Sequence, residues 1–170
     1  MWDNLGTDMP IQIRPIEPHQ IADAKRVILS VAKNIFEWPA PLEDVIRQFD
    51  NEGKLSDVDE MKSYRPENRG LFLVAIDAGN VIGTGAIRAI DQNSAEIKRL
   101  WLLERYHGQG IGYRMVTMLL DFARQAGYRR IQLLTDGKQG RAIQFYRRIG
   151  FSELDCRSED PEDVCMEIAI

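Results

Sequence analysis

A glycine-rich turn between an apolar segment and an amphipathic helix is the feature that most restricts the fold of this chain. The turn, residues 107–112, follows the apolar run 100–103 and precedes a segment whose apolar residues recur at helical spacing. Glycines at a strand-to-helix turn let the backbone approach a ligand, and the free amide N–H groups lie at the positive end of the helix dipole. The turn therefore predicts a pyrophosphate site at a helix N-terminus.

Two common phosphate loops can be tested against this turn. A Walker loop requires Gly-Lys-Ser/Thr after four spacer residues, but Gly112 is followed by Tyr113 and Arg114. A dinucleotide-binding fingerprint that starts at Gly108 requires glycine at position 113, which is tyrosine. Both alternatives are excluded.

Length and composition favour one globular domain. The chain has 170 residues, of which 44% are hydrophobic and 28% charged, as in ordinary soluble proteins. No apolar run approaches the ~20 residues that cross a bilayer, so no membrane partner is expected. Residues 1–4 lack the basic and apolar regions of a secretory signal, which predicts a cytoplasmic location.

The cysteines and histidines are too few to suggest a metal site. Cys156 and Cys165 lie in the last segment, where a C-terminal hairpin could bring them together. Without an export signal, thiols in a reducing compartment are the expected state, although a disulfide is geometrically possible. His19 and His107 are far apart and show no zinc-binding spacing, so no metal is expected.

Charge is distributed unevenly along the chain. The net charge is −4, but residues 98–148 contain eleven Lys and Arg against three acids, a local charge of +8. A basic segment within an acidic protein suits a small polyanionic ligand better than a nucleic acid, which needs a broad positive surface. The alternative is that these side chains only form solvated helix surface.

Periodicity predicts the order of helices and strands. The predicted strands are 11–14, 71–76, 81–87, 95–103 and 131–135, with two terminal strands around Phe151 and 164–170. The predicted helices are 19–36, 42–49, a short turn capped by Ser56, 111–126 and 140–149. In the strand 95–103, alternation would place Glu96, Lys98 and Leu100 on one face, and Ile97, Arg99 and Trp101 on the other.

The glycine turn and its neighbours resemble the GNAT superfamily of N-acetyltransferases. Gly110 and Gly112 match the acyl-CoA loop Gln/Arg-x-x-Gly-x-Gly/Ala, with His107 where the family usually has Gln or Arg. The segments 95–102 and 131–134 are similar to the strands on either side of that loop. Residues 142–151 are similar to the family's Ala-x-x-x-Tyr-x-x-x-Gly-Phe helix ending. The resemblance extends from about residue 71 to the C-terminus.

The resemblance implies an α+β fold of three α/β/α layers around a mixed, mostly antiparallel sheet of about seven strands. It implies a single N-acyltransferase domain over residues 1–170, with acceptor-side helices in 1–70 and an acyl-CoA-binding core in 71–170. The implied reaction transfers an acetyl group from acetyl-CoA to a primary amine of a small molecule or peptide by direct attack. No cysteine lies in the motifs, which argues against an acyl-enzyme. A homodimer formed through C-terminal strands is possible, and the alternative function is a non-catalytic acyl-CoA-binding regulatory module.

Three residues are candidates for catalysis. Glu96 is the candidate base, because a carboxylate within an apolar strand is costly without a role; the alternative is a structural ion pair, and Glu104 is a weaker candidate base. By resemblance, Tyr146 would protonate the leaving thiolate, although a helix tyrosine is often only a packing residue. The Leu100 amide would stabilise the oxyanion if the strand bulges there.

The resemblance also implies the residues that bind the cofactor. The backbones of Trp101 and Leu102 would pair with the pantetheine arm. Gln139 stands where the family often has an asparagine that contacts pantetheine. The remaining candidates are the loop residues His107, Gly108, Gln109, Gly110, Ile111 and Gly112, and Ala142 of the helix motif.

The acceptor side is expected to involve aromatic and acidic residues. Phe36, Trp38 and Tyr64 are aromatic candidates in the segment 35–64. The acids Asp57, Asp59 and Glu60 could attract a cationic amine, or could simply be solvated.

Overall fold

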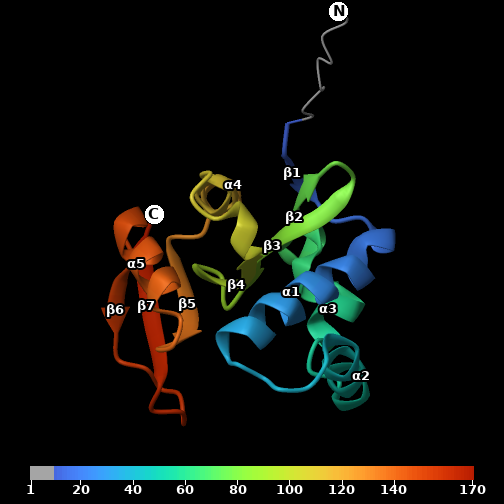
Figure 1. The fold of residues 1–170 in the computed structure, drawn as a ribbon. Coiled ribbons are helices and arrows are strands. Elements are labelled where there is room, and N and C mark those ends of the chain that lie inside the picture. Colours follow the sequence, from blue (N-terminus) through green and yellow to red (C-terminus); the bar gives the residue numbers. More distant parts are fainter. Residues whose placement is uncertain (1–9) are drawn as a thin grey trace, which may run out of the picture.

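Seven strands form one mixed sheet in the computed structural model, which describes residues 10–170 (Figure 1). Their spatial order is β1-β2-β3-β4-β5-β7-β6, and every neighbouring pair is antiparallel except β4 and β5. The strands are β1 Gln12–Pro15, β2 Leu71–Asp77, β3 Asn80–Ala89, β4 Ser94–Leu102, β5 Arg130–Asp136, β6 Ser152–Leu154 and β7 Asp163–Ala169.

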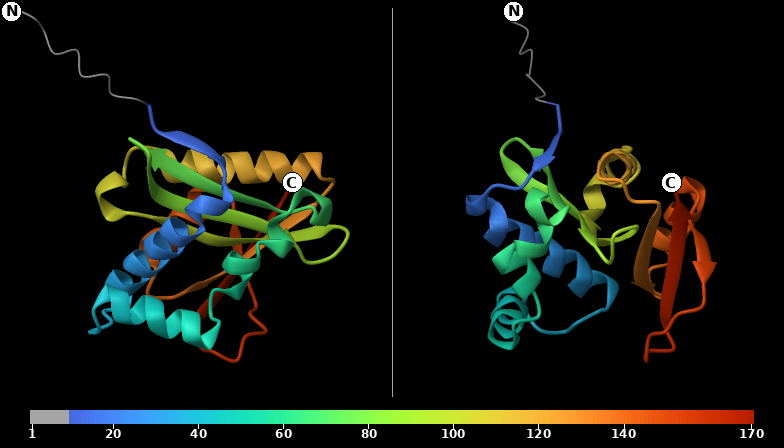
Figure 2. Two further views of the ribbon diagram at one scale, coloured as in Figure 1. Left: turned by 90° about the vertical axis from the view of Figure 1, so that its right-hand side faces the viewer. Right: turned by 180° about the vertical axis from the view of Figure 1, so that it is seen from behind.

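Helices cover both faces of the sheet (Figures 1 and 2). One face packs against α1 Ile21–Ile35, α2 Leu42–Glu52 and α3 Ser56–Glu60, and the other against α4 Ile111–Gln125 and α5 Gly140–Ile149. Short 3-10 turns complete the described chain: η1 Pro18–Gln20, η2 Lys62–Tyr64, η3 Pro66–Asn68 and η4 Glu104–Tyr106. The predicted three-layer α+β architecture is confirmed.

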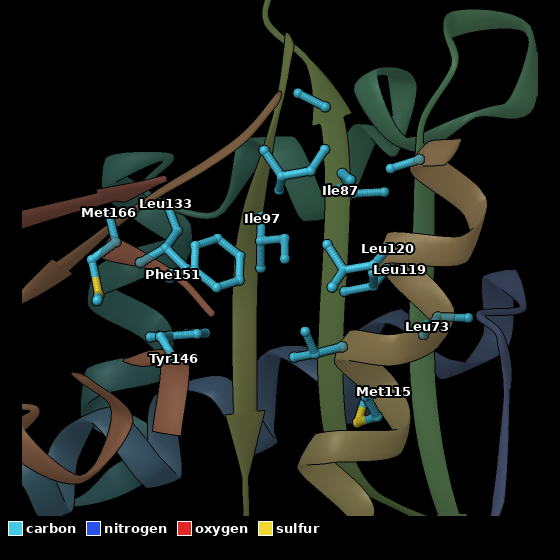
Figure 3. Packing of buried hydrophobic residues seen from close by; sticks show 14 of the residues in the cluster. Leu73, Ile87, Ile97, Met115, Leu119, Leu120, Leu133, Tyr146, Phe151 and Met166 are labelled. Carbon is cyan, nitrogen blue, oxygen red and sulfur yellow. The ribbon is translucent and has the colours of Figure 1, made fainter. Parts of the chain in front are cut away.

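The amphipathic sequence of α4 determines which of its faces is buried. Met115 and Leu119 are fully buried against the sheet, whereas Met118 on the same helix is 37% exposed. In Figure 3, Ile97 of β4 lies between the α4 side chains Leu119 and Leu120 on one side and a group around Tyr146 on the other. The core of this layer therefore joins α4 to α5 across β4.

A β-bulge interrupts β4 at Arg99 and Leu100. Lys98 pairs with Ala86 and Trp101 with Thr84, so two β4 residues lie opposite the single residue Gly85. Arg99 adopts a left-handed backbone with φ +55°. Such an extra residue shifts the alternation of all the side chains that follow it.

The predicted faces of β4 are wrong beyond Lys98 because of this bulge. Leu100 packs with Ile97 in the α4 layer, whereas Trp101 packs in the α1–α3 layer. Gly85 makes room for this arrangement, since a Cβ there would lie 2.9 Å from Leu100 Cδ1. The strand therefore presents Glu96, Lys98 and Arg99 toward the side of α1–α3.

β4 and β5 separate soon after they begin. Their parallel ladder contains the pairs Ser94–Arg130, Ala95–Ile131 and Glu96–Gln132 and ends there. β5 then continues beside β7 as far as Asp136, and β4 continues beside β3 as far as Leu102. The rear view of Figure 2 shows the two halves of the sheet diverging, which leaves one edge of β4 without a partner strand.

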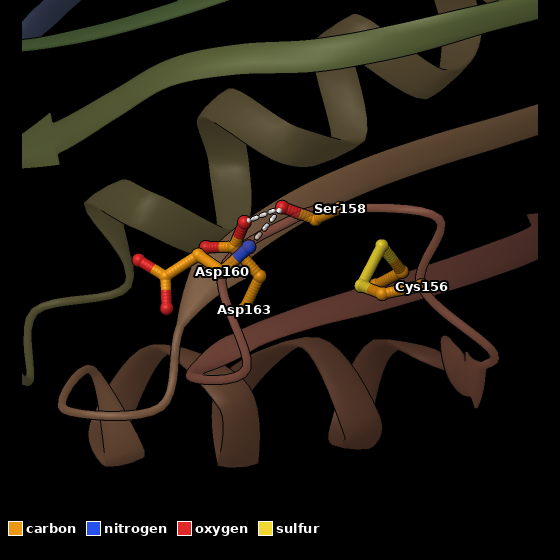
Figure 4. Close-up of a disulfide and its surroundings, with 5 residues drawn as sticks. Cys156, Ser158, Asp160 and Asp163 are labelled. Carbon is orange, nitrogen blue, oxygen red and sulfur yellow. Dashed lines mark hydrogen bonds between the residues drawn. A yellow bond between two sulfur atoms is a disulfide. The ribbon is translucent and has the colours of Figure 1, made fainter.

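Two further predictions need correction. The expectation of free thiols is wrong, because Cys156 and Cys165 form a disulfide that closes the β6–β7 connection (Figure 4). The hairpin register pairs Cys165 with Leu154, which brings the two cysteine Cα atoms to 5.2 Å. Ser56 begins α3 but does not cap it: Leu55 is the N-cap, without a side-chain hydrogen bond.

The expectation about localisation stays a prediction. Residues 1–4, on which it was based, lie outside the described residues. Within the described part of the chain, no helix combines the length and the apolar character needed to cross a lipid bilayer.

Candidate active site

A cleft of about 1090 Å³ opens where β4 and β5 separate. The end of β4 and the loop after it form one wall, the N-terminus of α4 and the helix α5 form another, and Val31, Asn34 and Ile35 of α1 close the third side. These three α1 residues were not predicted to lie at the site, because periodicity identifies the buried face of a helix but not its neighbours.

The N-terminus of α4 opens into this cleft without a cap. Gly110 is the N-cap in a left-handed conformation, φ +77°, and no side chain bonds to the first amides of the helix. Within the described chain, the amides of Gln109, Gly110, Ile111 and Gly112 have no protein acceptor. Unsatisfied N–H groups at a helix start form an anion site.

Charge and space around this helix start fit a phosphate-bearing ligand. The first turn of α4 contains no acidic residue, although acids are favoured there. Lys138, Arg141 and Arg148 line the cleft against the single acid Glu104. A Cβ on Gly110 would meet no protein atom within 4 Å, so the space above the loop is open. All residues of the loop 107–112 except Gln109 therefore line the cleft, and the binding of a pyrophosphate by this loop stays a prediction.

His107 is half-buried at the entry to the loop and is not the exposed histidine that is most common in loops. Its Nε2 lies 3.0 Å from the Leu102 carbonyl oxygen, and because that oxygen only accepts, Nε2 carries the proton. Nδ1 is then an acceptor when the ring is neutral, and it is buried without a partner. A buried unpaired acceptor is costly, so a ligand donor is expected to satisfy it.

Tyr146 lies at the inner end of the cleft. It is 6% exposed and packs against Phe145 and Phe151, with ring centroids 5.5 and 5.7 Å apart. Burial raises the pKa of its phenol, so the hydroxyl stays protonated at neutral pH. Tyr146 can therefore act as a proton donor to a group in the cleft.

Hydrogen bonds to both the backbone and the side chain of Arg99 hold the bulge in β4. Thr84 Oγ1 donates to the Arg99 carbonyl oxygen at 2.6 Å. The guanidinium donates to Asp57 of α3 through Nη2 at 2.7 Å and through Nε at 3.1 Å, and the Tyr64 hydroxyl donates to the same carboxylate at 2.5 Å. These contacts fix the backbone just before the Leu100 amide.

The hydrogen bonds among Thr84, Arg99, Asp57 and Tyr64, called the lock below, were not predicted from the sequence. The signal for it was the adjacent charges of Lys98 and Arg99 inside a strand, since alternation cannot place both on one face. Tyr64, predicted as an acceptor-side aromatic residue, is 3% exposed and belongs to the lock. Burial of Asp57 acts to raise its pKa, but hydrogen bonds from Arg99 and Tyr64 outweigh burial and lower it.

Glu96 lies apart from the cleft-lining residues. It accepts a hydrogen bond from Arg88 Nε at 2.5 Å, and its side chain is 26% exposed. The ion pair that the sequence left open as an alternative is therefore present. Glu104, the weaker candidate base, lines the cleft but is exposed.

The other predicted residues fall into two groups. Leu100, Trp101, Leu102, Gly108, Gln139 and Ala142 line the cleft. On the acceptor side, Phe36 and Trp38 stack at 5.8 Å between centroids, and Asp59 is paired with Lys25 at 2.7 Å. Glu60 is exposed. Within residues 10–170, no group of three or more His, Cys, Asp or Glu side chains is placed to hold a metal ion.

Residues 33–151 match the Acetyltransferase (GNAT) family. Rat N-acetyltransferase 8 is 34% identical over 100 residues, which cover 56% of this chain and 45% of the relative. An IAA acetyltransferase from Azospirillum brasilense is 39% identical over 84 residues, which cover 48% of this chain and 54% of the relative. The chain spans about half the length of the curated relatives it matches.

Solved structures share the fold along almost the entire chain. The PaiA N-acetyltransferase from Thermoplasma acidophilum in complex with coenzyme A superposes with a TM-score of 0.79 at 23% identity, covering 95% of this chain and 100% of that one. An acetyltransferase from Streptococcus agalactiae gives a TM-score of 0.76 at 22% identity, with coverages of 95% and 99%.

Asp57→Asn should weaken the lock on the bulge. The Arg99 and Asp57 side chains are 20% and 16% exposed, so the substitution leaves a largely buried guanidinium without its counter-charge. We expect the free energy of unfolding at pH 7 to fall by about 1–3 kcal/mol, measured by urea denaturation. Asp44→Asn, which affects an exposed pair with Arg47, is the matched control and should cost less than ~0.5 kcal/mol.

The stability difference between wild type and Asp57→Asn should also depend on pH. Because the folded-state pKa of Asp57 lies below its ordinary value of 3.8, its stabilisation is present above that value and is lost as the pH falls through the folded-state pKa. Urea denaturation as a function of pH should therefore show the two curves converging below pH 3.8. Equal losses in the Asp57 and Asp44 variants, or a difference that persists in strong acid, would contradict the lock.

Proposed function

Because the chain belongs to the acetyltransferase (GNAT) family, we propose that it transfers an acetyl group from acetyl-CoA to a primary amine by direct attack in a ternary complex. The observation that carries this proposal is the uncapped N-terminus of α4, which opens into a cleft that also reaches Tyr146. An anion site and a buried proton donor in one cleft match the two ends of an acyl-CoA.

Different residues of the cleft would bind different parts of the cofactor. The pyrophosphate would be held by the amides of residues 109–112. The 3′-phosphate of coenzyme A would lie near Lys138 and Arg141. The unpaired edge of β4 at Trp101 and Leu102 would bond to the pantetheine arm as an added strand would. His107 Nδ1, Gln139 and Ala142 would line the same arm. The segment 1–70 would supply the acceptor side of a single domain.

The transfer requires a neutral amine, because an alkylammonium of pKa ~10.4 has no lone pair to donate at neutral pH. One proton leaves the acceptor nitrogen before attack, and that nitrogen then forms a C–N bond to the thioester carbonyl carbon. Collapse of the tetrahedral intermediate breaks the C–S bond and releases a second proton from nitrogen. The thiolate takes one proton, so the products are the amide, the free thiol and one proton in solution.

Three groups of this chain would assist these steps. The Leu100 amide, aimed by the bulge, would donate to the oxyanion. The Tyr146 hydroxyl would protonate the leaving thiolate. Glu96 would take the proton of the acceptor ammonium through water, because it is the carboxylate on the face of β4 that looks toward α1–α3.

The second candidate function is a regulatory module that binds acyl-CoA without turnover. The observation that favours it is the ion pair of Glu96 with Arg88, which occupies the only carboxylate on β4. In such a module the uncapped N-terminus of α4 would bind acetyl-CoA, but no acceptor would cause the release of free coenzyme A thiol.

Gly110→Ala should weaken cofactor binding. A methyl group at this left-handed position costs about 1–2 kcal/mol of stability and occupies the open space above the amides. We expect the Kd for coenzyme A, measured by calorimetry, to rise at least about tenfold. Gly79→Ala, at φ +82° in the β2–β3 turn with equally open space, should lose similar stability with an unchanged Kd. Equal Kd values for the two variants would contradict the proposal that the N-terminus of α4 binds the phosphates of coenzyme A.

Tyr146→Phe should slow turnover while acetyl-CoA binding persists. We expect kcat to fall by about 100-fold or more, measured as acetyl-CoA-dependent thiol release with amino acids, polyamines, aminoglycosides and peptides as acceptors. Tyr128→Phe, which removes the hydroxyl of another buried tyrosine, one that donates to the Arg69 carbonyl at 2.8 Å, is the control and should leave kcat unchanged. Tight binding of acetyl-CoA with no release from any acceptor would favour the regulatory module.

Glu96→Gln and Arg88→Gln break the same ion pair and so separate its two roles. If Glu96 accepts the proton, Glu96→Gln should lower kcat by about 100-fold. Arg88→Gln removes the partner but keeps the carboxylate, so its kcat should stay near that of the wild-type protein. The same kcat in both variants would assign Glu96 a purely structural role.

A further inference from the structure

Lys98 is a half-buried cation on β4 without a partner. Among residues 10–170, no carboxylate oxygen lies within 4.0 Å of its Nζ, and the ammonium makes no hydrogen bond. By contrast, the buried lysine Lys25 of the same layer binds Asp50 and Asp59 at 2.5 and 2.7 Å. A half-buried charge without a partner is costly and calls for a physical reason.

The charges around Lys98 already compensate one another. Arg88 is paired with Glu96 at 2.5 Å, and Arg99 with Asp57 at 2.7 Å. One positive charge, that of Lys98, is therefore left over on this part of the β4 face. Burial and the neighbouring Arg88 lower the pKa of Lys98, which agrees with a cation that lacks a counter-ion.

Lys98 also lies next to the proposed reaction point. Lys98, Leu100 and Tyr146 line one small hollow of about 60 Å³, which opens between β4 and β5 just beyond their last pair. An amine that attacks an acetyl group held near the Leu100 amide and the Tyr146 hydroxyl must come close to this hollow. A substituent beside that amine would then lie near Lys98.

Two of the three acids that were expected to attract a cationic acceptor are already paired, and the third, Glu60, is exposed. Asp57 is occupied by Arg99 and Tyr64, and Asp59 by Lys25. The local balance therefore favours an anionic group on the acceptor over a second positive charge.

We propose that the acceptor is an amine with a carboxylate beside its amino group, as in an α-amino acid, and that Lys98 binds this carboxylate. This inference rests on the proposed function and names its substrate class. An ion pair would position the amine, and the nearby ammonium of Lys98 would disfavour the protonated form of the acceptor, which assists the loss of its first proton. Polyamines and peptides without a free carboxylate at this position should be poor acceptors.

Matched acceptors test this proposal directly. Leucine is compared with 3-methylbutylamine and with leucinamide, and phenylalanine with 2-phenylethylamine, by acetyl-CoA-dependent thiol release. We expect kcat/KM of the wild-type protein to favour the amino acids by about tenfold to a hundredfold, as a charged hydrogen bond allows. No preference in the wild-type protein would overturn the proposal without any variant.

Lys98→Met removes the charge but keeps the length of the side chain. We expect it to abolish the preference by raising KM for the amino acids, with the Kd for acetyl-CoA unchanged, whereas Lys98→Arg should retain the preference. Lys62→Met, at an exposed position in η2, is the matched control and should behave as wild type. A preference that survives Lys98→Met would overturn the role of Lys98.

Failure of this inference is distinguishable from failure of the proposed function. Thiol release from amines with and without a carboxylate at similar kcat/KM would leave an acetyltransferase whose substrate class is not set by Lys98. The absence of release from every acceptor, with acetyl-CoA bound, would overturn both.

Discussion

The early end of the ladder between β4 and β5 is the constraint on which the rest of the site depends. After Glu96 and Gln132 the two strands separate, and the free edge of β4 is left to a ligand. The separation also opens the cleft into which α4 directs its uncapped amides. If β4 and β5 stayed paired along their whole length, the backbone groups of β4 would be hydrogen-bonded to β5, and the N-terminus of α4 would face packed side chains in place of a cleft.

The bulge at Arg99 connects this edge with the acceptor side. Arg99 is held by Thr84 of β3 and by Asp57 of α3, so a helix from the first part of the chain sets the backbone before Leu100. A left-handed arginine is unfavourable by itself and persists because the surrounding contacts determine it. Through this residue the oxyanion donor that we propose depends on tertiary contacts with residues more than forty positions away.

Electrostatics on the β4 face follow from the same geometry. The bulge brings the charged residues Glu96, Lys98 and Arg99 toward one layer, and all but Lys98 find partners from β3 and α3. The alternation expected from the sequence would have divided these residues between two faces. For this reason the occupation of Asp57 and the isolation of Lys98 could not be predicted from residue order, although Lys98–Arg99 as adjacent charges in a strand was a sign of irregularity.

The tyrosine of α5 was identified by its resemblance to a family motif, whereas the secondary structure, the order of the elements and the glycine loop could be predicted from the sequence pattern. These depend on local rules: hydrophobic period, turn residues and the conformational freedom of glycine at Gly110. The tertiary structure was needed to establish which β4 side chains contact α3, that Cys156 and Cys165 are joined, that α1 lines the cleft, and which charge in the described chain has no partner. Such features depend on register and on distances between segments remote in sequence, and a single inserted residue in a strand reverses them.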